Sequence, residues 1–181
     1  MKFSDQVIEW MESDSDRMEA LELASTLGLN DWCLAAGFVR NLIWDKLHNK
    51  EVLTPLNDID LIYFDSAVMD ENADLDYEAR LKAVSRFPWS VKNQARMHVR
   101  NNDQPYVSTA DSMSYWVEVE TAVGATFVKG KGVRLVAPFG LEANFNHTIT
   151  LNSKRPKPND FKERVLGKEW CDLWPNLKVI S

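Results

Sequence analysis

The sequence lacks the features of membrane and secreted proteins. It contains no apolar run of the roughly 18 residues that a membrane-spanning helix needs, and a Trp and several acids interrupt its first residues before an apolar signal region can form. It has only two cysteines, Cys33 and Cys171, and neither has another Cys or His at metal-ligand spacing. These absences argue against a disulfide scaffold and a zinc site, and we expect a cytoplasmic protein that does not associate with membranes.

Glycine and proline are also scarce, with seven of each among 181 residues. The sequence shows no internal repeat, low-complexity tract or flexible linker that would mark a domain boundary. Hydrophobic residues make up 45% of the chain, which is enough to bury a core. We therefore expect residues 1–181 to form a single domain.

Positive charge is missing from one stretch of the chain. Residues 51–79 include nine Asp or Glu and no Lys or Arg. The net charge of −6 thus combines −13 for residues 1–79 with +7 for residues 80–181. An acidic stretch either stays solvated or gathers cations, whereas a basic half suits an anionic partner.

Helix and strand signals alternate in the first part of the chain. Helix formers over residues 17–27 follow candidate N-caps and stop at Gly28, which predicts a helix. The short apolar segment 31–36 predicts a buried strand, and residues 38–48 have apolar side chains at helical spacing. Residues 58–64 are β-rich and mostly apolar, which predicts a strand near the middle of a sheet.

Strand signals become more frequent in the second part of the chain. The elements expected there are a helix over 75–86, a strand over 89–99, a short helix starting at 108–111, a hairpin of strands 122–128 and 133–137, and a last helix from about residue 160. This order predicts an α+β (mixed α/β) fold in which helices flank a mixed sheet.

Asp58 and Asp60 are the most informative polar residues. Side chains two apart in a strand point to one face, so both carboxylates should project together while Ile59 and Leu61 fill the opposite face. Two neighbouring anions repel each other unless a cation lies between them. Magnesium is the natural candidate, because proteins commonly hold it with one or two carboxylates together with substrate phosphates. The alternative is that the pair is turn chemistry, as in the loops of many proteins.

Gly37 lies at the predicted junction between a strand and a helix. A glycine there lets backbone amides approach an anion, and the N-terminus of the following helix adds partial positive charge. The alternative interpretation is a plain tight turn in which the glycine allows close packing. The acidic strand that follows favours the phosphate-binding interpretation.

These two segments together resemble a known superfamily. Residues 36–41 (AGFVRN), followed by 58–60 (DID), resemble the glycine turn and Asp-X-Asp motif of the DNA polymerase β-like nucleotidyltransferase superfamily, which includes CCA-adding enzymes. Further blocks resemble a small bacterial family of nucleotidyltransferase-like proteins within it. These blocks are 44–45, 57–65, 89–98, 120–122, 137–141, 168–170 and 174–175.

The resemblance implies a polymerase β-like nucleotidyltransferase fold and a metal-dependent reaction. Asp58 and Asp60 would be the catalytic residues and the ligands of Mg2+ or Mn2+, and Gly37 would lie at the triphosphate of an NTP. The enzyme would move a nucleoside monophosphate from the NTP to an acceptor and release pyrophosphate. The acceptor, whether a small molecule, a protein or RNA, cannot be read from the sequence.

The sequence departs from the superfamily pattern at two positions. Ala36 stands where CCA-adding enzymes have the first of two glycines. Ser90 stands where the superfamily places a third metal-binding carboxylate on a neighbouring strand. Glu118 and Glu120 are the candidates for supplying that carboxylate from elsewhere.

Three basic residues are further candidates for binding the NTP. Arg40 either contacts a phosphate or fixes Asp45 across its helix, because arginine suits both anions. Lys92 and Arg96 lie in a block that resembles the family, so a role in substrate binding is expected from the resemblance. The alternative is that these polar residues form a structural network.

Two functions other than nucleotidyl transfer are consistent with the sequence. Ser90 at the position of the third acid suggests a catalytically degenerate module that binds nucleotides or regulates another protein. The aromatic segment 170–177 suggests a protein that keeps only the fold and docks to a partner.

Overall fold

A mixed five-stranded sheet forms the centre of the molecule. The computed structural model describes residues 2–181. The strands are β1 (Cys33–Ala35), β2 (Ile59–Tyr63), β3 (Trp89–Asn93), β4 (Gly124–Val128) and β5 (Gly132–Val136), and their order in the sheet is β3-β2-β1-β4-β5. Strands β2 and β3 are parallel, whereas the other neighbouring pairs are antiparallel. The predicted α+β fold class with a mixed sheet is therefore confirmed.

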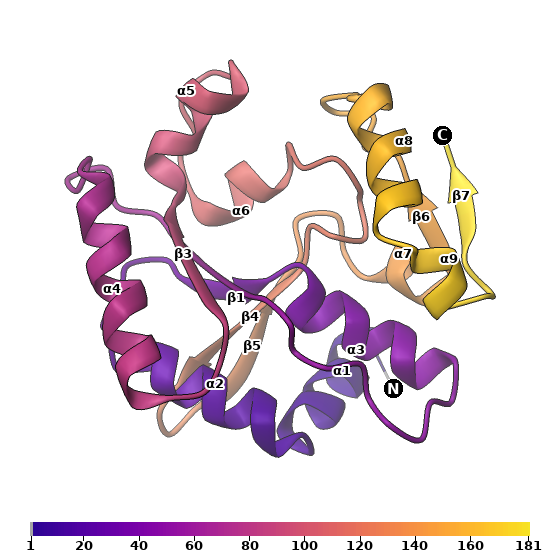
Figure 1. Ribbon diagram of the computed structural model, residues 1–181, viewed down its shortest axis with the longest axis horizontal. Helices are drawn as coiled ribbons and strands as arrows, with labels where there is room; N and C mark the ends of the chain where they lie inside the picture. The colour runs from indigo at the N-terminus through magenta and orange to yellow at the C-terminus, as the bar shows by residue number, and fades with distance from the viewer. Residues whose placement is uncertain (1) are drawn as a thin grey trace.

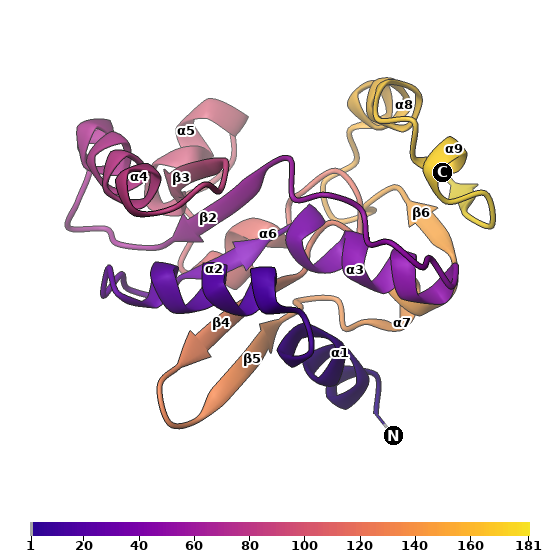
Figure 2. The same ribbon diagram turned by 60° about the horizontal axis from the view of Figure 1, so that its bottom comes forward.

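Helices surround this sheet. They are α1 (Phe3–Glu12), α2 (Ser15–Ser25), α3 (Gly37–Leu47), α4 (Glu71–Val84), α5 (Met97–Asn101), α6 (Thr109–Met113), α7 (Glu142–Phe145), α8 (Pro158–Gly167) and α9 (Trp170–Leu173), with a 3-10 turn at Gln94–Arg96. Figure 2 shows the N-terminal helices packed along the sheet and the β4–β5 hairpin extending beyond them. Within residues 2–181, no helix combines the length and the apolar character of a membrane span.

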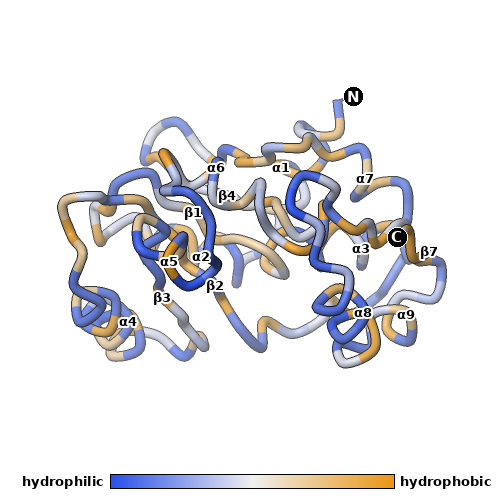
Figure 3. Tube along the Cα trace, turned by 90° about the horizontal axis from the view of Figure 1, so that it is seen from above, coloured by the Kyte–Doolittle hydropathy of each residue, from blue (hydrophilic) through white to orange (hydrophobic). Residues whose placement is uncertain are grey.

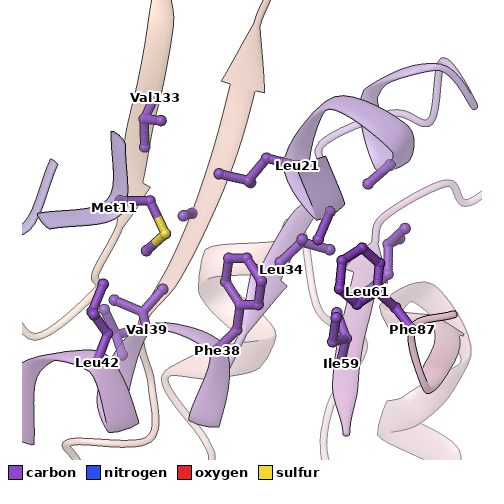
Figure 4. Close-up of a cluster of buried hydrophobic side chains, with 14 of the residues drawn as sticks. Met11, Leu21, Leu34, Phe38, Val39, Leu42, Ile59, Leu61, Phe87 and Val133 are labelled. Carbon is purple, nitrogen blue, oxygen red and sulfur yellow. The ribbon is translucent and has the colours of Figure 1, made fainter. Parts of the chain in front are cut away.

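The two faces of the sheet have different neighbours. Leu34, Ile59 and Leu61 pack with buried side chains of α1 to α4 in the main hydrophobic cluster (Figure 4). The alternate residues Cys33 and Ile62 point to the other face and pack against α6. Because α6 is short, a helix covers only part of this second face. Asp60 points to this face, whereas its neighbours in β2, Ile59 and Leu61, point to the main cluster on the other face.

The C-terminal part of the chain forms a second cluster on α3. Strands β6 (Thr148–Thr150) and β7 (Lys178–Ile180) pair in parallel. Trp170 and Trp174 pack edge-on against the buried Trp44 of α3, with ring centroids 5.9 and 5.0 Å away. The interpretation of segment 170–177 as a docking surface is therefore wrong for its large aromatic residues, because the chain itself buries them.

Most predicted elements are present, with shifted ends. The helices near 17–27, 38–48 and 75–86 correspond to α2, α3 and α4, and α4 begins four residues earlier than predicted. The strand expected over 89–99 is wrong beyond Asn93. The side chain of Asn93 accepts a hydrogen bond from the Ala95 amide and donates to two loop carbonyls, and this turns the chain into the 3-10 turn and α5.

The polarity of two helices fits their positions at the edges of the molecule. Figure 3 shows hydrophilic and hydrophobic residues alternating along α4 and α8. In Figure 1, α5 and α8 lie at the top of the molecule on either side of the sheet. The sheet residues that face this region form the site described next.

Candidate functional site

The turn between β1 and α3 has a strained backbone. Ala36 has φ 57° and ψ −123°, a conformation that glycine adopts readily and other residues do not. The Ala36 amide donates to the Val123 carbonyl, and the Ala36 carbonyl accepts from the Arg40 amide, so the conformation is fixed from both sides. Strain of this kind is stored most often at functional sites.

Ala36→Gly is expected to stabilise the protein. The backbone strain at a non-glycine residue costs about 1–3 kcal/mol, and the flexibility of glycine in the unfolded chain offsets about half of the gain. We expect a net stabilisation of about 1 kcal/mol, seen as a melting temperature that is higher by about 2–4 °C. The control is Ala35→Gly in β1, which removes a buried methyl group and should destabilise; a loss of stability with Ala36→Gly would contradict the strain.

Gly37 begins α3 and permits a close side-chain approach. A Cβ atom at this position would lie 3.2 Å from Asn41 Nδ2 and 3.3 Å from Arg40 Nη2. The glycine therefore makes room for two side chains of its own helix. These side chains define the start of α3, so Gly37 contributes to the site by close packing as well as by its position in the turn.

Arg40 is buried in the wall between the sheet and the C-terminal cluster. Its guanidinium donates to Thr121 Oγ1 at 2.8 Å and to Asn41 Oδ1 at 3.0 and 3.2 Å. It also lies over the rings of Trp44 and Trp170, with its central carbon 5.1 and 4.7 Å from their centroids. Burial lowers the pKa of Arg40 to about 10, so the side chain remains charged at neutral pH.

The interpretation that Arg40 fixes Asp45 is wrong. The Asp45 carboxylate accepts instead from the Thr54 amide at 2.6 Å, from Thr54 Oγ1 at 2.7 Å and from Trp174 Nε1 at 2.8 Å. Arg40 and Asp45 both belong to α3, but their side chains bind different partners. Arg40 faces the sheet end, where the paired aspartates lie.

Asp58 and Asp60 lie at the start of β2. Asp58 is exposed and directly precedes the strand, which begins at Ile59, and Asp60 is partly buried within it. Burial and the neighbouring Asp58 charge raise the pKa of Asp60 to about 6. Arg40, Lys168 and Arg164 act in the opposite direction, so cations from two parts of the chain lie near this carboxylate.

Ser90 lies beside Asp60 on the neighbouring strand. The two residues are register partners in the parallel pair β2–β3, and partners of this kind point to the same face of the sheet. A carboxylate at position 90 would therefore stand next to Asp60. Among the residues that the structure describes, no three acidic, histidine or cysteine side chains form a cluster that could hold a metal.

Glu118 and Glu120 do not replace the missing acid at Ser90. Glu120 is fully buried and accepts from the Thr150 amide, Thr150 Oγ1 and Thr148 Oγ1 at 2.6–2.8 Å, and burial raises its pKa. Glu118 is also buried, and it binds Arg164 through two hydrogen bonds of 2.5 and 3.2 Å. Each glutamate is thus fixed by its own partners.

A cleft of about 640 Å³ opens over the uncovered face of the sheet. The residues that line it come from four places: the end of the sheet, the α5 region, the segment that precedes β4, and helix α8. Figure 1 shows α5 and α8 on opposite sides of this face. The lining residues are Ala36, Asp60, Ile62, Lys92, Gln94, Met97, Arg100, Asn101, Trp116, Val117, Glu118, Thr121, Lys157, Asp160, Glu163 and Arg164. The cleft thus joins the strained turn and one of the paired aspartates to basic side chains from three segments.

Lys92 and Arg96 have different positions. Lys92 follows Ser90 by two residues in β3, points to the same face and lines the cleft. Arg96 does not line the cleft but a neighbouring hollow, which shares Lys92 with it. There Arg96 pairs with the buried Asp74 and lies 3.7 Å from a Glu71 oxygen. Asp74 also accepts from the Tyr63 hydroxyl at 2.6 Å, so Arg96 belongs to a buried network between β2 and α4.

Sequence reasoning missed the contribution of α8 to the site. Glu118 and Arg164 are 46 residues apart, and no short motif links them. The signal that was available is the helical spacing of charged residues: Lys157, Asp160 and Arg164 recur at three and four residues and therefore share one face of the helix. This face lines the cleft.

The comparison with protein families gives a match over most of the chain. A family described as Nucleotidyltransferase matches residues 22–179. No curated protein sequence matches the chain.

Solved structures share the fold. A protein whose NMR structure is described as revealing a CCA-adding enzyme head domain is 31% identical, with a TM-score of 0.83 over 99% of this chain and 96% of that one. A CCA-adding enzyme in complex with CTP is 14% identical, with a TM-score of 0.61 over 100% of this chain and 44% of that one. A tRNA-processing enzyme complex is 15% identical, with a TM-score of 0.56 over 88% and 42%. The chain thus corresponds to less than half of the two longer enzymes.

Proposed function

The chain belongs to the nucleotidyltransferase family, and we propose that it moves a nucleoside monophosphate from an NTP to an acceptor in the cleft, with Mg2+ or Mn2+ as the metal. The observation that carries this proposal is the position of Asp58 and Asp60 at the sheet end, with Asp60 in a cleft that also includes the strained turn at Ala36. We propose that residues 1–181 act as one catalytic domain.

The carboxylate pair has the donor chemistry that magnesium requires. Carboxylate oxygens are hard ligands, and both burial and the charge of Asp58 raise the pKa of Asp60, so a cation bound there would relieve an electrostatic cost. Two carboxylates leave the other coordination positions to water and substrate phosphates, which is the usual environment of Mg2+ at nucleotide sites. When bound, the ion would neutralise charge at the phosphates and polarise the reacting phosphoryl group.

The reaction exchanges one bond to phosphorus for another. An acceptor hydroxyl oxygen bonds to the α-phosphorus, and the bond from that phosphorus to the oxygen bridging to the β-phosphorus breaks. Pyrophosphate leaves with the electron pair of the broken bond, and the hydroxyl proton passes to water. Asp58 and Asp60 would hold the metal ion at the sheet end, and Lys92 would contact a substrate phosphate from β3. Because the protein supplies mainly position and charge, alignment of the acceptor with the leaving group controls the rate.

The substrates follow in part from the family and in part from the cleft. A triphosphate suits the cations near Asp60, and CTP is the first NTP to test because a structure with the same fold contains it. Gly37 and Arg40 would support the turn at Ala36, where we expect the phosphates of the NTP to bind. The acceptor and the expected cytoplasmic location stay predictions.

A thermal-shift titration tests the proposal. The wild-type protein and the double variant Asp58→Asn/Asp60→Asn are titrated with each of the four NTPs, with and without Mg2+ or Mn2+. A ligand that binds only the folded state stabilises it by about 2.7 kcal/mol at 100 times its Kd. We expect one NTP to stabilise the wild type only with metal, and the double variant to lose this response.

Release of pyrophosphate from the same mixtures separates two candidate functions. Ser90 beside Asp60 favours a second candidate, a module that binds nucleotide without turning it over. Metal-dependent stabilisation together with pyrophosphate release supports the transferase, whereas stabilisation alone with every acceptor tried supports the binding module. No thermal shift with any NTP would contradict both candidates.

A further inference from the structure

A second hollow, of about 310 Å³, opens beside the cleft between α4 and α5. Figures 1 and 2 both show these two helices side by side next to β3. The residues that line the hollow are Glu71, Leu75, Lys92, Arg96, Met97, Val99 and Arg100. The cleft shares Lys92, Met97 and Arg100 with it, so the two spaces adjoin. A molecule bound in the cleft can therefore extend into the hollow.

Positive charge exceeds negative charge in this hollow. Three cationic side chains line it, whereas Glu71 is its one acidic lining residue. The ion pairs formed among residues 2–181 include neither Lys92 nor Arg100. An anion in the hollow would therefore meet two cations that no carboxylate in the described part of the chain already binds.

Arg96 adds a hydrogen-bond donor to the same wall. Its side chain is only 14% exposed, and its Nη2 group pairs with the buried Asp74. Its Nε atom is buried and has no hydrogen-bond partner among the described residues. Because buried polar groups in proteins are nearly always hydrogen-bonded, this donor indicates an acceptor that the chain itself does not supply.

The rest of the hollow is apolar and exposed to solvent. Leu75 of α4 is 53% exposed, and Val99 of α5 is 74% exposed. Single exposed apolar side chains are ordinary, but these two come from different helices and line one hollow together with Met97. A ligand with an apolar arm would remove them from water, which is favourable.

From these features we propose that the hollow binds the non-reacting end of the acceptor, and that this end carries an anionic group beside an apolar arm. This inference rests on the proposed function, because the reacting hydroxyl of the same molecule has to reach Asp58 and Asp60 through the adjoining cleft. A carboxylate and a phosphate monoester both offer the charged oxygens that lysine and arginine bind. The acceptor class is therefore a small amphiphilic anion.

An NMR titration of the backbone amides tests this site without NTP or metal. The probes are hexanoate and hexyl phosphate, and comparison of the two identifies the preferred anionic group. We expect at least one of them to bind with a Kd of about 1 mM or tighter and to shift the amides of residues 71–75 and 92–100. Hexan-1-ol lacks the anion, and acetate and inorganic phosphate lack the arm, so each should bind about tenfold more weakly or worse.

Two substitutions separate the anionic and apolar parts of the site. Arg100→Met should weaken binding of the preferred probe about tenfold, and Leu75→Ala about threefold or more. Both side chains are exposed, so both variants should fold like the wild type. Leu75→Ala should also keep the metal-dependent response to an NTP, because Leu75 does not line the cleft.

Arg80→Met and Val84→Ala are the matched control variants. Both residues are exposed on α4, as Leu75 is, but neither lines the hollow. The control proteins should bind both probes like the wild type. Equal weakening in the controls and in Arg100→Met and Leu75→Ala would overturn the inference.

The possible results distinguish this inference from the proposed function. The inference is overturned if neither probe binds saturably, or if the amide shifts lie away from the hollow. In that case a metal-dependent stabilisation by an NTP would leave the proposed function standing. If a probe binds in the hollow but no NTP stabilises the protein, the proposed function is contradicted and the acceptor role of the hollow with it.

Discussion

Asp60→Asn is expected to make the metal-free protein more stable while removing the metal-dependent nucleotidyl transfer that we propose. Measured with EDTA at pH 7.5, we expect a gain of about 1–2 kcal/mol, seen as a melting temperature higher by about 3–6 °C. Pyrophosphate release should fall by about a thousandfold or more, since the variant loses one of the two carboxylates proposed to hold the metal. A purely structural aspartate would not give this opposite pair of effects.

The physical reason is the cost of the Asp60 charge in the fold. Burial, together with the charge of Asp58, raises the pKa of Asp60 from 3.8 to about 6. The folded state therefore binds a proton more tightly than the unfolded state, and ionisation of Asp60 destabilises the fold as the pH rises through about 6. The full shift would correspond to about 3 kcal/mol, which partial exposure and solvent screening reduce.

The pH dependence checks the sign of this effect. The stability difference between Asp60→Asn and the wild type should be largest above pH 6 and should disappear below about pH 4, where Asp60 is protonated in both states. Asp58→Asn is the matched comparison: Asp58 is exposed, and its removal should stabilise the protein less than Asp60→Asn does, because it relieves the repulsion and leaves Asp60 buried. A destabilised Asp60→Asn protein at pH 7.5 would show that the carboxylate is structural.

Arg40→Met is expected to cause the largest loss of stability among the substitutions considered. The buried guanidinium holds Thr121 and Asn41 and packs on two tryptophan rings, and its charge offsets those of Glu118 and Asp60. Removing one partner from a buried charge network typically costs about 3–5 kcal/mol. Urea unfolding should therefore show a free energy of unfolding lower by about 3 kcal/mol or more.

Arg40→Lys serves as the control for charge alone. Lysine keeps the positive charge but cannot reproduce the planar fork that reaches Thr121 and Asn41 together. We expect a loss intermediate between wild type and Arg40→Met. If Arg40→Met were as stable as the wild type, the contacts of the Arg40 guanidinium with Thr121, Asn41 and the tryptophan rings would not contribute to stability.

The sequence predicted the part of the fold that local patterns encode. Alternation of apolar residues placed Ile59 and Leu61 on the face opposite Asp60, and the main hydrophobic cluster confirms this. Apolar spacing and turn residues located α2, α3 and the β4–β5 hairpin. These patterns succeed because each element buries one face, and the burial is visible as a period of two or 3.6 residues.

The remaining parts depend on contacts between distant residues. The end of β3 at Asn93 is set by hydrogen bonds to Asp65 and Val68, 28 and 25 residues away, and not by local propensity. The ion pair between Glu118 and Arg164 could not be predicted for the same reason. The positions of Asp58 and Asp60 as candidate metal ligands followed from spacing and resemblance, whereas the cleft around them required the tertiary structure.

The packing of the C-terminal cluster on α3 has a consequence for the order of folding during synthesis. The hydrogen bond from Trp174 to Asp45 joins residues 129 positions apart, and α8, which forms one wall of the cleft, is held by the same aromatic cluster. The sheet and helices α1 to α4 can condense on the ribosome while residues 158–174 are still inside the exit tunnel. The nascent chain therefore carries its paired aspartates in a shallow, open surface, and the cleft is completed only when the tryptophans emerge.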